Sequence, residues 1–235
     1  MVHPTEIVIR DTLAKNAKLF LRQAVHYILQ DEHTAKDVMD IEIATLASAN
    51  IQIALELGVK AFLVDRLGIF SILDQKHHAI PVSEIFVLFN ENELKTTQFE
   101  QTKNILKNKF SNEFSEEAFY FLDLFQKYRN KIVHFNLFLD AEKYDIKYDL
   151  IYVVCHVLVK LLLFNSNNPW ELYLSVLGPK EYNNLCSYPP YLTRMETMVR
   201  DNAGDGWICP ICNKKTFDKH EGLCYCCNFF SGGLG

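Results

Sequence analysis

The sequence predicts a mainly α protein that ends in a small β-rich module closed by cysteines. Two long segments, over residues 5–30 and 34–66, carry apolar residues at the spacing of helix turns. Glycine and proline, which interrupt helices, number only 9 and 7 among 235 residues. Five of the seven cysteines fall between positions 209 and 227, which indicates a compact metal site. We therefore expect a helical domain over 1–168, a connecting segment with short helices over 169–200 and the cysteine module over 201–235.

The composition limits the possible classes of function. The net charge of −5 argues against nonspecific adhesion to nucleic acid or to an anionic membrane, so any RNA binding needs a local groove. The start, Met1 to Pro4, lacks the charged and apolar stretches of a signal peptide. The most apolar run, 150–164, is too short to span a bilayer and contains His156 and Lys160, which predicts a buried helix. Clustered cysteines favour a reducing compartment, so we expect a cytoplasmic protein with no membrane partner.

The first half of the chain is predicted to contain two long helices and a less regular region. The first helix covers 5–30, with Lys and Arg between its apolar positions. The second begins near Thr34, whose hydroxyl suits an N-cap, and ends at Gly68, a stop signal. Residues 69–95 are less regular, and the polar, Lys-bearing stretch around 103–109 is expected to form an exposed helix.

Two more helices are predicted in the second half. The third strong helix begins around Ser115, whose side chain can cap it, and Glu116 and Glu117 suit the positive end of its dipole. A very apolar helix follows over roughly 147–165, in which His156 is expected to be a hydrogen-bonded core residue. Shorter pieces follow, and residues 201–206 form a polar, glycine-bearing linker.

The segment from Arg129 to His134, near the end of the third strong helix, points to a reaction. On a helix with about 100° per residue, Asn130 and His134 lie one turn apart and share the polar face. Arg129 lies instead within the apolar stripe, where a guanidinium needs partners. Arg129 can therefore be a structural residue paired with an acid such as Glu56 or Asp65, or a functional one.

The geometry of a regular helix limits how Arg129 and His134 can act on the same phosphate. Arg129 and His134 point about 140° apart on a regular helix. Both can meet one phosphate only if the last turn is distorted or if two copies of the helix pack together. We therefore expect a homodimer formed through the motif-bearing helices.

An Arg, a polar residue beside it and a His at this spacing, late in a helix of an all-α domain, resemble the HEPN superfamily. The resemblance covers roughly 34–165, and its specific part is Arg129, Asn130 and His134. The residues from Glu56 to Leu63 are also similar to an early helix of that family. The resemblance implies a helical bundle that dimerises with its motif helices facing each other.

The resemblance also implies an activity. Many members are metal-independent endoribonucleases of toxin–antitoxin and antiphage-defence systems, so an RNA substrate and an antitoxin or defence-system partner are expected. Asn136 stands where related toxins commonly carry a Tyr that can be modified, which argues against regulation by that route. The alternative is a non-catalytic HEPN-like module that binds RNA or a protein.

The residue types fit cleavage of RNA by its own 2′-hydroxyl, which leaves a 2′,3′-cyclic phosphate and a 5′-hydroxyl. His134, with an ordinary pKa near 6.5, can exchange protons near neutral pH. Arg129 can hold the phosphate and stabilise the developing charge. Asn130 can orient the phosphate or the imidazole ring.

The cysteines form two Cys-x-x-Cys pairs, Cys209 with Cys212 and Cys224 with Cys227, and the module is similar to a zinc ribbon. Four thiolates suit tetrahedral Zn²⁺, and a saturated site leaves no position for a catalytic water, which predicts a structural metal. Cys226 can replace Cys224 or Cys227 as a ligand, and His220 is a less favoured substitute. The role of the module stays open between RNA contact through its lysines, stabilisation of the fold alone and docking of a protein.

Overall fold

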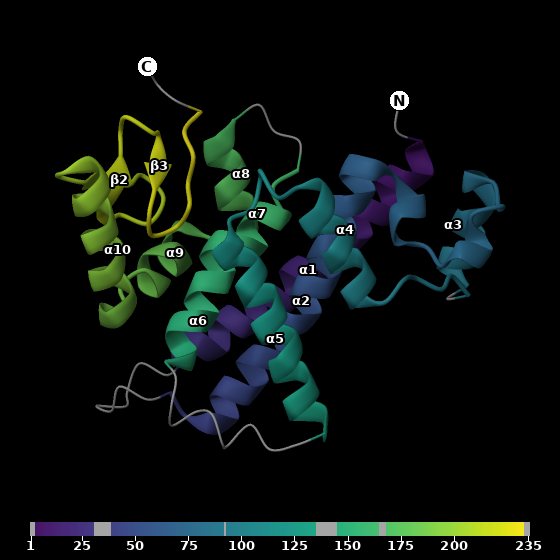
Figure 1. Cartoon of the computed structure of the whole chain (residues 1–235), viewed down its shortest axis with the longest axis horizontal. Helices are drawn as coiled ribbons and strands as arrows, with labels where there is room; N and C mark the ends of the chain where they lie inside the picture. The colour runs from purple at the N-terminus through teal and green to yellow at the C-terminus, as the bar shows by residue number, and fades with distance from the viewer. Residues whose placement is uncertain (1–2, 31–38, 92, 135–144, 165–167, 233–235) are drawn as a thin grey trace.

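The computed structural model describes residues 3–30, 39–91, 93–134, 145–164 and 168–232, with the backbone alone at 132–134. Its described part is mainly helical and ends in a small three-stranded sheet (Figure 1). The fold class predicted from the sequence, a mainly α chain with a small C-terminal β module, is therefore confirmed at this level.

Two helices of 27 residues, α1 (Pro4–Gln30) and α2 (Ile41–Leu67), pack along each other and form the centre of the bundle (Figure 1). The predicted start of the second helix near Thr34 is wrong. The carboxylate of Asp40 accepts hydrogen bonds from the N–H groups of Glu42 at 2.9 Å and Ile43 at 3.1 Å, which makes Asp40 the N-cap. Thr34 itself lies outside the described residues. The predicted stop at Gly68 is confirmed, with a φ of 83° that favours glycine.

The helix α2 is apolar because it crosses the core. By length and composition it could cross a membrane, but 72% of its apolar window is buried inside the protein. Small residues on both central helices, all nearly inaccessible, let the two backbones approach closely: Ala14, Ala17 and Ala24 on α1, and Ala44, Ala47 and Ala54 on α2.

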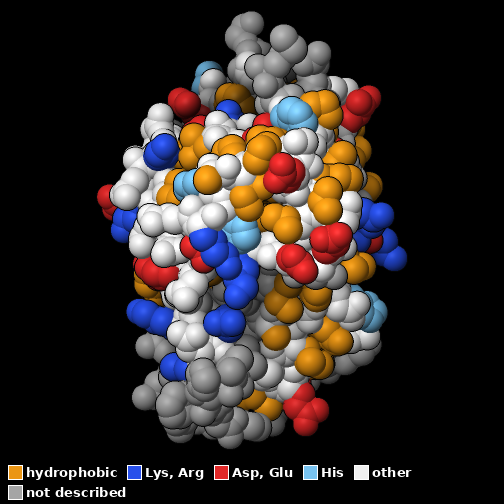
Figure 2. All heavy atoms as spheres, turned by 90° about the vertical axis from the view of Figure 1, so that its right-hand side faces the viewer, with side chains coloured by type: hydrophobic (Ala, Val, Ile, Leu, Met, Phe, Trp, Pro, Cys, Tyr) orange, Lys and Arg blue, Asp and Glu red, His pale blue; other side chains and the backbone are white. Residues whose placement is uncertain are grey.

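The region after α2 contains two short 3₁₀ turns, η2 (Ile69–Ile72) and η3 (Gln75–His77), and the helix α3 (Val82–Asn90). Only Ile85 of α3 is buried, and Val87 is 51% exposed. The face of the molecule on the α3 side accordingly shows many apolar side chains beside a cluster of Lys and Arg (Figure 2). This short helix lies at the edge of the bundle rather than in its core (Figure 1).

The predicted Lys-bearing helix is α4 (Phe99–Lys109), but it is not exposed throughout. Lys107 and Lys109 face solvent, whereas Lys103 is buried. The ammonium of Lys103 forms ion pairs with Glu100 at 2.9 Å and with Asp123. These carboxylates compensate the cost of burying its charge, which periodicity alone does not reveal.

The motif-bearing helix is α5 (Glu116–His134). Its predicted cap is confirmed, since the hydroxyl of Ser115 accepts a hydrogen bond from the N–H of Ala118 at 3.2 Å. The predicted apolar helix is also present and buried. It consists of α6 (Ile146–Tyr152), a π-helical segment η5 (Val153–Leu158) and α7 (Val159–Leu161). Within it, His156 is the expected hydrogen-bonded residue, with its Nε2 2.9 Å from the hydroxyl of Tyr191, and desolvation lowers its pKa to about 4.

Three helices follow, each with a proline at its start: α8 (Pro169–Val176), α9 (Pro179–Leu185) and α10 (Pro189–Ala203). The strands β1 (Trp207–Ile208), β2 (Lys215–Asp218) and β3 (Leu223–Cys224) then form an antiparallel sheet in that order. Gly206 is required beside β1, because a Cβ there would lie 2.4 Å from the carbonyl oxygen of Lys215.

Buried tyrosines join the sheet module to the helices. The hydroxyl of Tyr173 on α8 donates to the carbonyl of Asn228, and that of Tyr191 on α10 donates to the carbonyl of Cys226. A third, Tyr182 on α9, donates to the carbonyl of Tyr173 at 3.1 Å. The cysteine module is therefore packed on the helical part through specific polar contacts.

Candidate metal centre and the cavity at the motif helix

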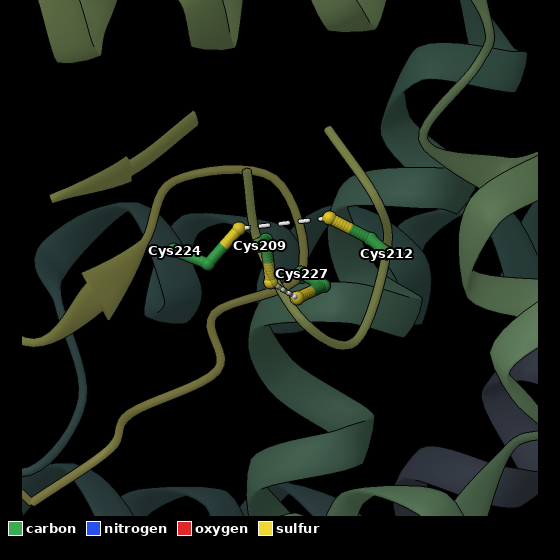
Figure 3. Close-up of side chains that lie close together, drawn as sticks. All are labelled: Cys209, Cys212, Cys224 and Cys227. Atoms are coloured by element: carbon green, nitrogen blue, oxygen red, sulfur yellow. Dashed lines mark hydrogen bonds between the residues drawn. The ribbon is translucent and has the colours of Figure 1, made fainter. Parts of the chain in front are cut away.

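The four cysteines predicted as ligands come together within the sheet module (Figure 3). All four are buried, and their sulfur atoms lie within 4.8 Å of one another. The Sγ atoms of Cys209 and Cys227 are 3.6 Å apart, and those of Cys212 and Cys224 are 3.7 Å apart. Four thiolates around one ion at about 2.3 Å place their sulfurs about 3.8 Å apart. The group is therefore close enough to hold a metal ion.

The two Cys-x-x-Cys turns have the same backbone geometry. Each is followed by an asparagine with positive φ, 58° at Asn213 and 57° at Asn228. The N–H of each asparagine donates to the carbonyl of the first cysteine of its pair, at 2.9 Å in both turns. Asparagine tolerates this left-handed conformation better than most residues. The asparagine after each pair is a sequence signal that strengthens the assignment of the four ligands.

The alternatives to these ligands are placed outside the group. Cys226 is fully buried but is not one of the four described side chains that share the site. His220 is exposed, and its backbone N–H donates to the carboxylate of Asp218 at 2.8 Å. Neither residue replaces a predicted ligand in the described part of the chain.

Arg129 does not face the core, contrary to the wheel-based expectation. Its neighbours Phe125 and Tyr128 are buried, but Arg129 and Asn130 are both exposed. Tyr128 is the last residue of α5 whose side chain the structure shows to be buried. The side chain of His134 lies outside the described residues, and its backbone is the last residue of α5.

The two ion pairs suggested for Arg129 are not formed. The carboxylate of Glu56 pairs with Lys60 at 2.7 Å, and that of Asp65 pairs with Arg10 at 2.8 Å. Among the described residues, no carboxylate forms an ion pair with Arg129. The guanidinium is therefore available for a ligand.

Arg129 lines a polar cavity of about 380 Å³ between α2, the start of α4 and α5. Deep in this cavity lies Gln52, only 3% exposed, and neither atom of its side-chain amide has a hydrogen-bond partner. Leaving a buried polar group unpaired costs about 1–3 kcal/mol, so such groups are rare without a reason. The other lining residues are mostly polar or charged: Glu56, Gln98, Phe99, Glu100 and Gln126.

The wall of this cavity is fixed by the buried Lys103. Its ammonium contacts Gln126 Oε1 at 2.7 Å and the carboxylates of Glu100 and Asp123. Burial lowers the pKa of Lys103, but the two carboxylates outweigh it, so its pKa is raised overall. Asp123 therefore joins α5 to α4 through this buried ammonium.

Sequence reasoning missed Gln52 as part of this site and expected Lys103 on an exposed helix. The signal available for Gln52 is a single amide within the most apolar stretch of α2, between Ile51 and Ile53. Amides in helices are common, and the sequence does not show which of them lose contact with water. Only packing of α4 and α5 against α2 shows that this one is enclosed.

A second cavity, of about 620 Å³, runs along α1 and is lined by Arg10, Lys15, Lys18 and Arg22 among others. Burial, and then the charge of Arg22, lowers the pKa of Lys18. In the described ranges no carboxylate lies within ion-pair distance of Lys18. A chain with net charge −5 thus carries a local surface suited to anions.

The carboxyl group of Asp149, on α6, titrates unusually close to neutral pH. Desolvation raises its pKa to about 7, although the hydroxyl of Tyr128 donates to it at 3.3 Å. Because the pKa in the folded protein lies above the ordinary value of 3.8, the folded state holds more protons than the unfolded state between these pH values. The free energy of unfolding therefore falls as the pH rises through this window.

We expect Asp149→Asn to remove this pH dependence. The variant should be more stable than the native protein at pH 8, by on the order of 2 kcal/mol, and should lose that advantage near pH 4. Urea unfolding at several pH values measures the effect, with the exposed Asp201→Asn as control. Parallel pH profiles for the native protein and Asp149→Asn would contradict the assignment.

Protein-family models, curated proteins and solved structures give no match to the chain. The chemistry of the two sites is therefore derived from the types, contacts and burial of their own residues.

Proposed function

We propose that this protein is a metal-independent endoribonuclease whose catalytic residues are Arg129, Asn130 and His134. The observation that supports the proposal is the environment of the Arg129 side chain. It is exposed, it forms no ion pair with a described residue, and it stands at a polar cavity on the helix that ends at His134. An exposed guanidinium without an ion pair can form charge-assisted hydrogen bonds with a phosphate.

The proposed reaction is a transesterification within RNA. The 2′-hydroxyl loses its proton and its oxygen bonds to the adjacent phosphorus, while the bond from phosphorus to the 5′-oxygen breaks. His134 exchanges the proton with the nucleophile or the leaving oxygen, which contributes roughly 10²–10⁴ in rate. Arg129 stabilises the charge on the phosphate oxygens, and Asn130 orients the phosphate or the imidazole. DNA lacks the 2′-hydroxyl and is not a substrate.

A homodimer completes the proposed site. The backbone of α5 stays α-helical to His134, so it gives no sign of the distortion that would aim both side chains at one phosphate. This favours a site in which Arg129 of one subunit meets His134 of the other. The basic cavity along α1 offers a place for further RNA phosphates.

We also propose Zn²⁺ as the ion held by the four cysteines. Buried thiolates in two Cys-x-x-Cys turns suit zinc, and four sulfur ligands leave no position for a reacting water. The metal would stabilise the sheet module and take no part in RNA cleavage. A role as a toxin or antiphage-defence effector in the cytoplasm, with an antitoxin or defence-system partner, follows from the HEPN resemblance.

Analysis of RNA products tests the proposal directly. Purified full-length protein is incubated with total RNA in EDTA, and the ends of the fragments are analysed, with the zinc content measured before and after. We expect 2′,3′-cyclic phosphate and 5′-hydroxyl ends. Intact RNA in the presence of folded, metal-loaded dimer would contradict it and support the alternative, a non-catalytic HEPN-like module that binds RNA or a protein.

A further inference from the structure

The cavity beside Arg129 contains an unsatisfied amide that RNA cleavage at a phosphate does not explain. Gln52 is buried at 3% exposure in an apolar helix, and both Oε1 and Nε2 lack a hydrogen-bond partner. An apolar residue of similar size would avoid this loss at no cost to packing. The amide therefore indicates a ligand that supplies the missing hydrogen bonds.

We infer that this cavity holds an unpaired guanine base of the RNA, next to the phosphate that Arg129 contacts. The inference rests on the proposed function for the identity of the ligand as RNA. Single-stranded RNA is commonly recognised by bases turned out of the stack and hydrogen-bonded along their edges. A cavity of about 380 Å³ has room for a purine.

The charges around the cavity favour a base over a phosphate as its occupant. Two carboxylates, Glu56 and Glu100, line it together with Arg129. Both carboxylates are held by buried lysines, Lys60 at 2.7 Å and Lys103 at 2.9 Å. A phosphate inside the cavity would meet these carboxylates, whereas a neutral base can use donors and acceptors together.

The positions of Gln52 and Glu56 distinguish among the four bases. The two residues are one turn apart on α2 and both line the cavity. Glu56 accepts from Lys60 through Oε1, and Lys60 is fixed further by the hydroxyl of Thr96 at 3.0 Å. The second oxygen of Glu56 can therefore accept from a ligand without moving the side chain.

Guanine presents the edge that this pair of side chains fits. Its N1–H and N2–H groups can donate to Glu56, and its O6 can accept from Nε2 of Gln52. Adenine and cytosine place a ring-nitrogen acceptor in the middle of the same edge, which would oppose the carboxylate. Uracil offers one donor between two acceptors and fills less of the space. The ring of Phe99 adds an apolar surface to the wall.

Titration of the full-length protein with nucleoside monophosphates tests the inference. We expect GMP to bind at least roughly ten-fold more tightly than AMP, CMP or UMP, by calorimetry, and Glu56→Gln to remove most of this preference. Gln52→Leu should weaken GMP binding while leaving the protein at least as stable to heat. Glu42→Gln, an exposed acid of α2 outside the cavity, is the matched control and should bind GMP like the native protein.

The outcomes separate this inference from the proposed function. Equal binding of the four nucleotides, or unchanged GMP binding in both cavity variants, would overturn the guanine assignment. Displacement of GMP by inorganic phosphate at the same concentration would overturn it as well, in favour of a phosphate occupant. RNA cleavage without preference for guanine would support the proposed nuclease activity and refute the binding of guanine in the cavity. Guanine binding without any RNA cleavage would support the cavity assignment and refute the nuclease activity.

Discussion

Arg129→Ala is expected to reduce RNA cleavage by roughly 10²–10³ or more, because the charge that develops on the phosphate loses its guanidinium partner. His134→Ala should have an effect of similar or larger size through loss of proton transfer. The rate is measured under single-turnover conditions in EDTA. Lys127→Ala is the matched control, since Lys127 is another exposed cation on the same helix and does not line the cavity.

The Arg129→Ala variant should keep its fold. Arg129 and Asn130 are exposed, and no carboxylate among the described residues depends on Arg129 for its charge partner. Circular dichroism and metal content should therefore match those of the native protein. Cleavage at the native rate by both Arg129→Ala and His134→Ala would remove these residues from the mechanism.

Mixing the two inactive variants tests whether the site is shared between subunits. If Arg129 of one subunit works with His134 of the other, a mixed dimer contains one complete site and one site that lacks both residues. Statistical exchange would then restore about a quarter of the native activity. No recovery after verified subunit exchange would place Arg129 and His134 of the same chain together, against the dimeric site.

The second large effect is expected from loss of a cysteine ligand. Cys212→Ser or Cys224→Ser should release the metal and unfold the sheet module, because metal binding in small modules of this kind contributes on the order of 10 kcal/mol or more to folding. Metal content by mass spectrometry and thermal unfolding measure the result. Complete removal of the metal from the native protein, verified by mass spectrometry, should have the same effect.

Cys226→Ser provides the matched control for the ligand substitutions. Cys226 is as buried as the four ligands and lies in the same turn as two of them, but its side chain is outside the group. The variant should keep one equivalent of metal. Loss of metal in Cys226→Ser, together with retention in Cys224→Ser, would exchange the roles of these two cysteines.

Regular features of the fold were predictable because local sequence determines them. The cap at Ser115, the stop at Gly68 and the burial of the helix that begins at Ile146 follow from short-range rules. The cysteine group was predictable for a similar reason, since the spacing within each pair fixes a turn. The start of α2 was missed because two residues with capping side chains, Thr34 and Asp40, precede the same apolar run.

The cavity could not be predicted because it is made by three helices that are distant in the sequence. Periodicity placed Arg129 in the apolar stripe, but the extent of the stripe depends on where the neighbouring helices end. Lys103 was expected in solvent because Asp123, the carboxylate that pairs with it in addition to Glu100 of its own helix, lies on α5. Enclosure of Gln52 likewise requires α4 to lie over α2.

The hydroxyl groups of Tyr173 and Tyr191 connect the helices with the cysteine module, which was predicted from the sequence as a separate domain. Each donates from a helix to a backbone carbonyl next to a cysteine ligand, so these bonds require the module to be folded around its ion. Release of the ion would leave the hydroxyl of Tyr173 without its acceptor and that of Tyr191 with only the imidazole of His156 as a partner. The metal would then stabilise the folded state of the whole chain by mass action, as does any ligand that binds only the folded protein. A shortage of the metal would therefore lower the amount of folded protein in the cell, its helical part included.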